Sequence, residues 1–253
     1  AAETGAVDEA LVRRELALLA RRVAGARDKA RAESGETTAG GAADAQALAR
    51  AIFEESAFVR EVDSTELRHV LLPDVLASRK GSCVGLGTLY LALGEKLGIP
   101  LEGVVVPGHF FVRARTPTGD VRNLELLRQG EVMPDSFYRD KYLTNRAAPA
   151  FFRPLTTREI AAVVRFNVGN ELRRANRLTE AARFYRRAAE DFPQWGEAHA
   201  SLGLVLQLAG DRAGARAAYA AAAKAEPNLP GLQQNLELLE DESGGVRPTT
   251  TPR

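Results

Sequence analysis

The sequence predicts two parts, an N-terminal α+β domain whose helices pack on a small antiparallel sheet, followed by an all-helical domain. Two observations carry this prediction. Residues 83–97 have the apolar spacing of a helix, and three short apolar runs separated by turn residues follow them, which is the order of an α+β domain. From residue 162 onward the apolar spacing is helical throughout.

In the first part, two helices over residues 7–32 and 42–58 precede the helix at 83–97. Gly98 and Pro100 mark the end of that third helix. The three apolar runs that follow are expected to be strands, with turn chemistry at 116–120 between the last two. These strands are expected at 101–106, 109–115 and 121–127.

The last two strands form a hairpin if the turn centres on Thr118, and position i then faces roughly position 236 − i. Side chains alternate between the two faces of a strand, so His109, Asn123 and Glu125 share one face. A carboxylate or amide on that face can fix the tautomer of the histidine and stabilise its imidazolium form.

Cys83 is the candidate nucleophile. It is expected to begin a helix, with Ser82 as the N-cap, and the unpaired N–H groups of a helix start favour a thiolate. Arg79 and Lys80 add positive charge nearby. The ordinary alternatives are a packed core cysteine, a structural histidine and a solvated glutamate.

Residues 79–130 resemble the transglutaminase-like superfamily, in its SirB-type bacterial branch, which shares a papain-like Cys-His-acid plan. The matching segments are Arg79-Lys-Gly-Ser-Cys83, Leu89-Tyr90-Leu91-Ala92, Leu97-Gly-Ile-Pro100 and Pro107-Gly-His-Phe-Phe-Val112. The resemblance implies a domain over residues 1–144 with Cys83 as nucleophile, His109 as base and Glu125 as orienter. The third residue of the superfamily is usually Asp, so Asn123 stays an alternative to Glu125. Many members of this branch lack the cysteine.

The second part contains an internal repeat. Five positions recur at an interval of 34 residues, with small residues where paired helices touch and a proline closing each unit, which is the signature of tetratricopeptide repeats. The first set is Gly169, Ala181, Tyr185, Ala188 and Pro193, and the second is Gly203, Ala215, Tyr219, Ala222 and Pro227.

The repeats imply a domain over 159–241, with units at about 162–195 and 196–229 and then a capping helix. Residues 145–158 are expected to be a linker, and 242–253 a disordered tail.

The composition excludes some classes of function. Because 34 Lys and Arg oppose 33 Asp and Glu, the formal charge of +1 gives no footprint for a nucleic-acid partner. No apolar stretch approaches the roughly 18 residues that indicate a membrane span. Three dispersed histidines and one cysteine predict no metal site, and no cofactor is expected.

The composition also bears on origin and compartment. Richness in Ala, Arg, Leu and Gly fits a GC-rich bacterial genome. The start at Ala1 is compatible with a removed signal peptide or with a trimmed start, which leaves cytoplasmic and exported locations open for a soluble protein.

The resulting hypothesis is thiol acyl transfer at an amide, in a chain that holds a protein or peptide partner in a repeat groove. Water as the acyl acceptor would make the protein a peptidase or amidase, and a lysine would make it a cross-linker. The alternatives are an inactive scaffold that serves as a protein-protein adaptor, and a peptide-binding module that keeps the cleft without turnover.

Overall fold

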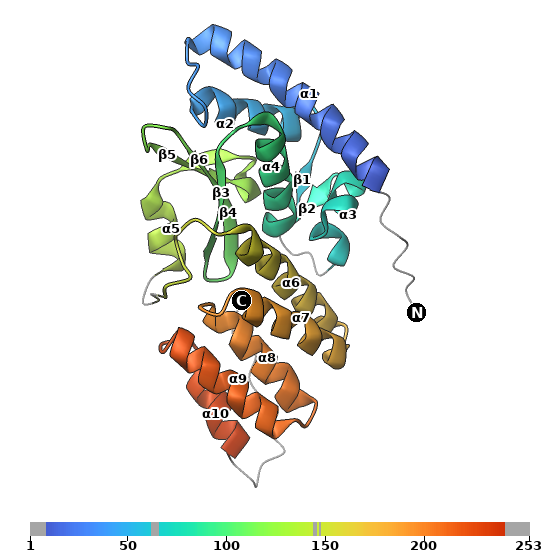
Figure 1. Cartoon of the computed structure of the whole chain (residues 1–253), viewed down its shortest axis with the longest axis vertical. Helices are drawn as coiled ribbons and strands as arrows, with labels where there is room; N and C mark the ends of the chain where they lie inside the picture. The colour runs from blue at the N-terminus through green and yellow to red at the C-terminus, as the bar shows by residue number, and fades with distance from the viewer. Residues whose placement is uncertain (1–8, 62–65, 144–145, 147, 241–253) are drawn as a thin grey trace. The chain divides into compact units, whose positions relative to one another are not determined.

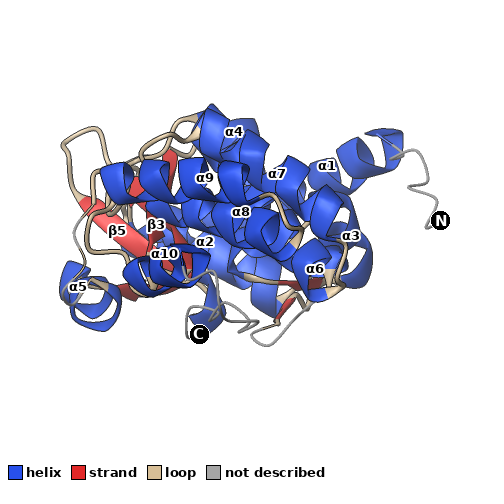
Figure 2. Ribbon diagram, turned by 90° about the horizontal axis from the view of Figure 1, so that it is seen from below, coloured by secondary structure: helices blue, strands red, loops and turns tan. Residues whose placement is uncertain are grey.

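The computed structural model describes residues 9–61, 66–143, 146 and 148–240. The chain forms two compact units, one of residues 1–104 with 109–138 and one of residues 105–108 with 139–253 (Figure 1). Helices make up most of the described chain (Figure 2). Within this described part, no helix combines the length and the apolarity needed to cross a membrane. The predicted disordered tail lies outside the described residues.

The helices of the first unit include the three expected from the sequence. They are α1 (Glu9–Ser34), α2 (Ala42–Ala49), α3 (Leu72–Ser78) and α4 (Cys83–Leu97), with short 3-10 turns at η2 (Leu67–His69) and η3 (Leu126–Arg128).

The continuous helix predicted at 42–58 was wrong in its second half. After α2 the chain widens into a single π turn, η1 (Arg50–Glu54), in which the Glu55 N–H donates to the Arg50 carbonyl. Ala57 then takes a left-handed φ of 54°, which no α-helix accommodates.

The main sheet has the strand order β3-β4-β5-β6. The strands are β3 (Leu101–Val106), β4 (His109–Arg115), β5 (Val121–Glu125) and β6 (Glu131–Met133). The predicted hairpin register is confirmed, because Val112 pairs with Leu124 and Arg113 with Asn123, each pair summing to 236. The third strand ends at Glu125 instead of residue 127, since the chain turns there into η3.

Three short strands were not predicted. These are β6 and the parallel pair β1 (Val59–Arg60) and β2 (Lys80–Gly81). A strand of two or three residues is too short to leave an alternating pattern in the sequence. The first unit therefore contains a small parallel pair beside the antiparallel sheet that the sequence predicted.

Helix α4 begins and ends as the sequence predicts. The Ser82 hydroxyl accepts from the Gly85 N–H, and Gly98 takes a left-handed φ of 66° at the other end. The helix packs on the sheet where Gly87 meets Phe110 of β4, so closely that a Cβ at position 87 would lie 2.3 Å from that ring. A small residue at this crossing lets the helix start approach the sheet.

The second unit is built from helical hairpins. Its helices are α6 (Thr157–Arg174), α7 (Leu178–Asp191), α8 (Gly196–Leu208), α9 (Arg212–Ala225) and α10 (Leu232–Glu240), preceded by α5 (Asp135–Tyr142), which begins in the first unit. The 34-residue interval has a structural counterpart, because a Cβ at Gly169 would lie 2.8 Å from the Tyr185 ring and one at Gly203 would lie 2.6 Å from the Tyr219 ring. Equivalent positions thus make the same close helix contact twice.

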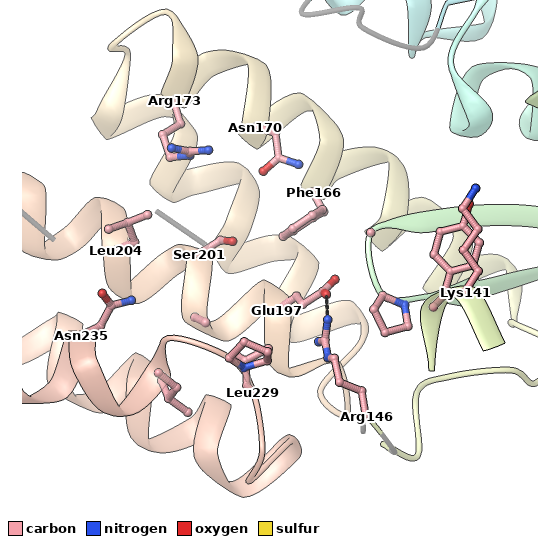
Figure 3. Close-up of a pocket in the computed structure, with 16 residues that line it drawn as sticks. Lys141, Arg146, Phe166, Asn170, Arg173, Glu197, Ser201, Leu204, Leu229 and Asn235 are labelled. Carbon is pink, nitrogen blue, oxygen red and sulfur yellow. Dashed lines mark hydrogen bonds and ion pairs between the residues drawn. The ribbon is translucent and has the colours of Figure 1, made fainter. Parts of the chain in front are cut away.

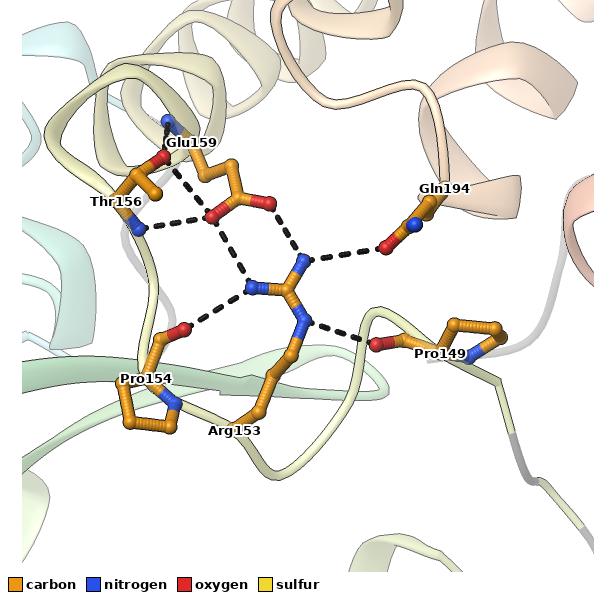
Figure 4. Close-up of polar contacts among 6 residues, drawn as sticks. All are labelled: Pro149, Arg153, Pro154, Thr156, Glu159 and Gln194. Carbon is orange, nitrogen blue, oxygen red and sulfur yellow. Dashed lines mark hydrogen bonds and ion pairs between the residues drawn. The ribbon is translucent and has the colours of Figure 1, made fainter.

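The segment before α6 is held by one arginine (Figure 4). Arg153 donates to the carbonyls of Pro149 (2.9 Å) and Pro154 (3.0 Å) and pairs with the carboxylate of Glu159. Glu159 also closes a capping box with Thr156 at the start of the helix. Helix α6 therefore begins at Thr157, inside the segment expected to be a linker.

Candidate active site

Cys83 is the first residue of α4, and the turn before it holds the helix start in place. The backbone N–H of Ser82 donates to the His69 carbonyl (2.8 Å), and so does the Ser82 hydroxyl (3.0 Å). This carbonyl lies against Gly85, where a Cβ would come within 2.2 Å of the oxygen. Only glycine at position 85 allows η2 to support the helix start. Cys83, taken as a whole residue, is partly exposed.

His109 and Glu125 meet as the hairpin register predicts. His109 opens β4 and Glu125 closes β5, and both are buried, with 6% and 2% of their surface exposed. The His109 Nε2 lies 2.8 Å from Glu125 Oε2, and Glu125 Oε1 accepts from the Leu127 N–H at 3.0 Å. Both carboxylate oxygens are therefore engaged, and the imidazole keeps Nδ1 for another partner.

That partner is the thiol of Cys83. Burial would raise the pKa of this thiol, but a hydrogen bond from the imidazole, the charge of His109 and the Phe110 backbone N–H outweigh burial and hold the pKa below its usual value. Each of these groups stabilises a thiolate. The site thus favours ionised sulfur.

The pKa of His109 is raised and the pKa of Glu125 is lowered. Burial alone would lower the pKa of His109, yet the bonds to Cys83 and Glu125 and their negative charges raise it to about 9. Burial would likewise raise the pKa of Glu125, while His109 and the Leu127 N–H bring it below its ordinary range. These shifts all favour a thiolate, an imidazolium and a carboxylate in series.

Tyr138 of α5 packs against residues of this site. Its ring stacks on Phe111 with centroids 3.8 Å apart and lies parallel to the His109 ring at 6.3 Å. Its side chain is fully buried, and its hydroxyl helps to lower the pKa of Glu125. Neither this residue nor its helix was predicted from the sequence, although Pro134 and Asp135 are a helix-start signal.

Asn123, the alternative third residue, points to other partners. Its Oδ1 accepts from Arg113 Nε at 2.8 Å, and its Nδ2 donates to Asp135 Oδ1 at 2.8 Å. The acid that contacts the imidazole is thus Glu125. Across the residues that the structure describes, no group of three or more His, Cys, Asp or Glu side chains is arranged to hold a metal ion.

The sequence matches a known protein family. A family model described as the transglutaminase-like superfamily matches residues 10–164, more than half of the chain. The chain belongs to this superfamily. The matched region contains all three residues of the Cys83–His109–Glu125 series and extends into α6.

Curated relatives carry the name UPF0162 protein. One from Xylella fastidiosa strain 9a5c is 28% identical over 157 residues, which are 59% of this chain and 56% of the relative. Another from strain Temecula1 is 27% identical over 156 residues, 58% of this chain and 55% of the relative. One from Vibrio cholerae is 37% identical over 68 residues, 26% of this chain and 25% of the relative. The chain spans about half the length of the first two.

Proposed function

We propose that the first unit catalyses thiol acyl transfer at an amide, with Cys83 as nucleophile, His109 as acid and base, and Glu125 as the residue that orients His109. The observation that carries the proposal is the continuous series of contacts from the thiol through the imidazole to the carboxylate. The lowered pKa of the thiol and the raised pKa of the imidazole supply the two charge states that such a reaction needs.

The reaction begins when the Cys83 thiolate attacks the carbonyl carbon of an amide and a C–S bond forms. His109 gives its Nδ1 proton to the departing amine as the C–N bond breaks, which leaves a thioester on Cys83 and a neutral imidazole. Water or a second amine then loses a proton to His109 and attacks the thioester. The C–S bond breaks, the thiolate returns, and the product is a carboxylic acid or a new amide.

The start of α4 suits the charge that develops on the carbonyl oxygen. The first N–H groups of a helix have no acceptor within the helix, and the helix dipole is positive at this end. The N–H groups beside Cys83 therefore support an oxyanion in the tetrahedral intermediate.

We also propose that α6–α10 are two tetratricopeptide repeats with a capping helix, and that they hold a protein or peptide partner. The 34-residue interval and the repeated contact of a helix glycine with a tyrosine ring support this assignment. A partner module in the same chain as an acyl-transfer unit would bring the protein that carries the target amide to the enzyme.

The test is the pH dependence of Cys83 alkylation by iodoacetamide in the parent protein, in His109→Ala and in the control His199→Ala. His199 suits the control because it contacts the Pro193 carbonyl in the second unit. A parent thiol that reacts readily near pH 6, about 100-fold faster than in His109→Ala, would support the Cys-His pair. A slow thiol with equal rates in all three proteins would instead favour the inactive scaffold.

A further inference from the structure

The second unit contains a cavity of about 580 Å³ whose lining residues all belong to that unit. Figure 3 shows α6, α8 and α10 contributing side chains to its wall, among them Phe166, Asn170, Arg173, Ser201, Leu204 and Asn235. Pockets of roughly 300–1,000 Å³ accommodate a drug-sized ligand. The cavity is therefore large enough for several residues of an extended peptide.

The charges around the cavity favour an anionic ligand. The lining includes the cations Lys141, Arg146 and Arg173 and the carboxylate of Glu197. Arg146 is already occupied, because it pairs with Glu197 at 2.9 Å and with the buried Glu226 at 2.7 Å. Arg173 lies near Tyr185, and among the described residues it forms no ion pair with a carboxylate. Positive charge is thus in excess at the α6 side of the cavity.

The Asn170 amide is oriented by the same tyrosine. The Tyr185 hydroxyl donates to Asn170 Oδ1 at 2.7 Å. Because the amide oxygen is used in this way, the Nδ2 group of Asn170 remains as a hydrogen-bond donor at the cavity wall (Figure 3).

A second amide faces the cavity from α10. The side chain of Asn235 is more than nine-tenths buried, and among the described residues its Oδ1 has no hydrogen-bond partner. A buried amide with unused bonding capacity is costly unless a ligand or water completes it. Paired amides can bond the backbone of an extended peptide, and Phe166 and Leu204 between them offer apolar surface.

We infer that this cavity binds an extended peptide segment that carries an acidic side chain next to an apolar one. The acidic group bonds to Arg173, the apolar group packs on Phe166 and Leu204, and the two asparagines bond to the peptide backbone. This inference rests on the partner-binding part of the proposed function and is independent of the chemistry at Cys83.

The chain carries its own reporter of occupancy. Trp195 is the one tryptophan in the sequence. Its ring lies 4.5 Å from that of Phe166, and its Nε1 donates to Glu197 Oε2 at 3.2 Å. A ligand that reaches Phe166 and Glu197 will change the surroundings of this indole and hence its fluorescence.

The experiment titrates the full chain with three capped peptides in which leucine alternates with aspartate, asparagine or lysine, and follows Trp195 fluorescence. The aspartate peptide is expected to bind about tenfold more tightly than the asparagine peptide, and the lysine peptide most weakly. Arg173→Glu should remove this preference, and Asn235→Ala should weaken binding of the aspartate and asparagine peptides alike.

The matched control is Arg186→Glu, which reverses the same charge at an exposed position of α7 outside the cavity lining. It should bind as the parent does. Equal affinity for the aspartate and asparagine peptides would overturn the acidic preference while leaving a partner module in place. A preference for the aspartate peptide that survives Arg173→Glu, or no binding of any peptide, would overturn the assignment of the cavity. None of these outcomes bears on Cys83 alkylation.

Discussion

Two buried glutamates, one in each unit, show how differently the two parts use charge. Glu125 and Glu226 are 2% and 1% exposed. Burial raises the pKa of both carboxyls, but His109, the Leu127 N–H and Tyr138 reverse the effect at Glu125 and lower its pKa. At Glu226, burial together with the nearby charge of Glu197 outweighs Arg146, and the pKa stays raised.

The difference lies in the number of groups that support the charged form. Glu125 has partners on both oxygens and a cation within 2.8 Å, so its carboxylate is held in one orientation. Glu226 shares a single arginine with a second carboxylate. A fixed and fully bonded carboxylate can orient a catalytic imidazole, whereas a shared one mainly holds a neighbouring segment in place.

The two units also differ in the origin of their close contacts. Those of the first unit join segments that are unrelated in sequence, and those of the second recur at a constant interval. Three experiments test these comparisons between the units, from the largest expected effect to the smallest.

Gly85→Ala should destabilise the first unit by about 2–3 kcal/mol, because its Cβ would meet a backbone carbonyl that cannot turn aside. Gly169→Ala should cost the second unit less than about 1 kcal/mol, since a tyrosine ring can yield and alanine favours the helix. Urea titrations would measure the free energy of unfolding of each variant. Cys83 alkylation would report unfolding in Gly85→Ala, and Trp195 fluorescence would report it in Gly169→Ala. Equal losses would contradict the contrast.

Glu125→Gln should lower the pKa of His109 from about 9 by roughly 1 pH unit or more, because a carboxylate stabilises the imidazolium and an amide does not. Because the pKa of His109 is raised to about 9 in the parent, the imidazole keeps its proton up to about that pH. In the variant the imidazole loses this proton at a lower pH. Titration of ¹³C-labelled histidine by NMR would measure it.

The control for this variant is Glu131→Gln, since Glu131 is the register partner of Glu125 on β6 and pairs with Arg128. Its effect on the His109 pKa should be small. If both variants leave that pKa unchanged, Glu125 does not support the imidazolium.

Tyr185→Phe and Tyr219→Phe should each cost about 1 kcal/mol, because each removes one hydroxyl bond, to Asn170 Oδ1 and to Gln207 Oε1 respectively, both 2.7 Å long. The two losses should agree within a few tenths of a kcal/mol if the hairpins are equivalent repeats. Urea unfolding followed by circular dichroism provides the comparison, and a clear inequality would show that the two hairpins are not energetically equivalent.

Much of the local structure could be predicted because its causes are local. Ser82 and Gly98 bound α4 through their own side-chain and backbone preferences, and the turn around Thr118 determined a hairpin register that the structure reproduces. The 34-residue interval was visible in the sequence because each helical hairpin makes the same contact between a glycine and a tyrosine ring.

The parts that could not be predicted depend on distant partners. Strands β1 and β2 exist because two short segments pair side by side, and neither carries a pattern of its own. The π turn after α2 and the position of Tyr138 over His109 likewise follow from packing. Residues without a periodic pattern are placed by the tertiary structure.

The sequence by itself determined the two-part order of elements, the helix start at Cys83 and the face shared by His109, Asn123 and Glu125. It left the choice between Asn123 and Glu125 open, because both alternate onto the same side of a strand. Only the tertiary structure decided which of them touches the imidazole: Arg113 and Asp135 engage the amide, and the turn into η3 brings Glu125 to the ring. The physical reason is that alternation selects a face, whereas contact depends on what the neighbouring segments already bind.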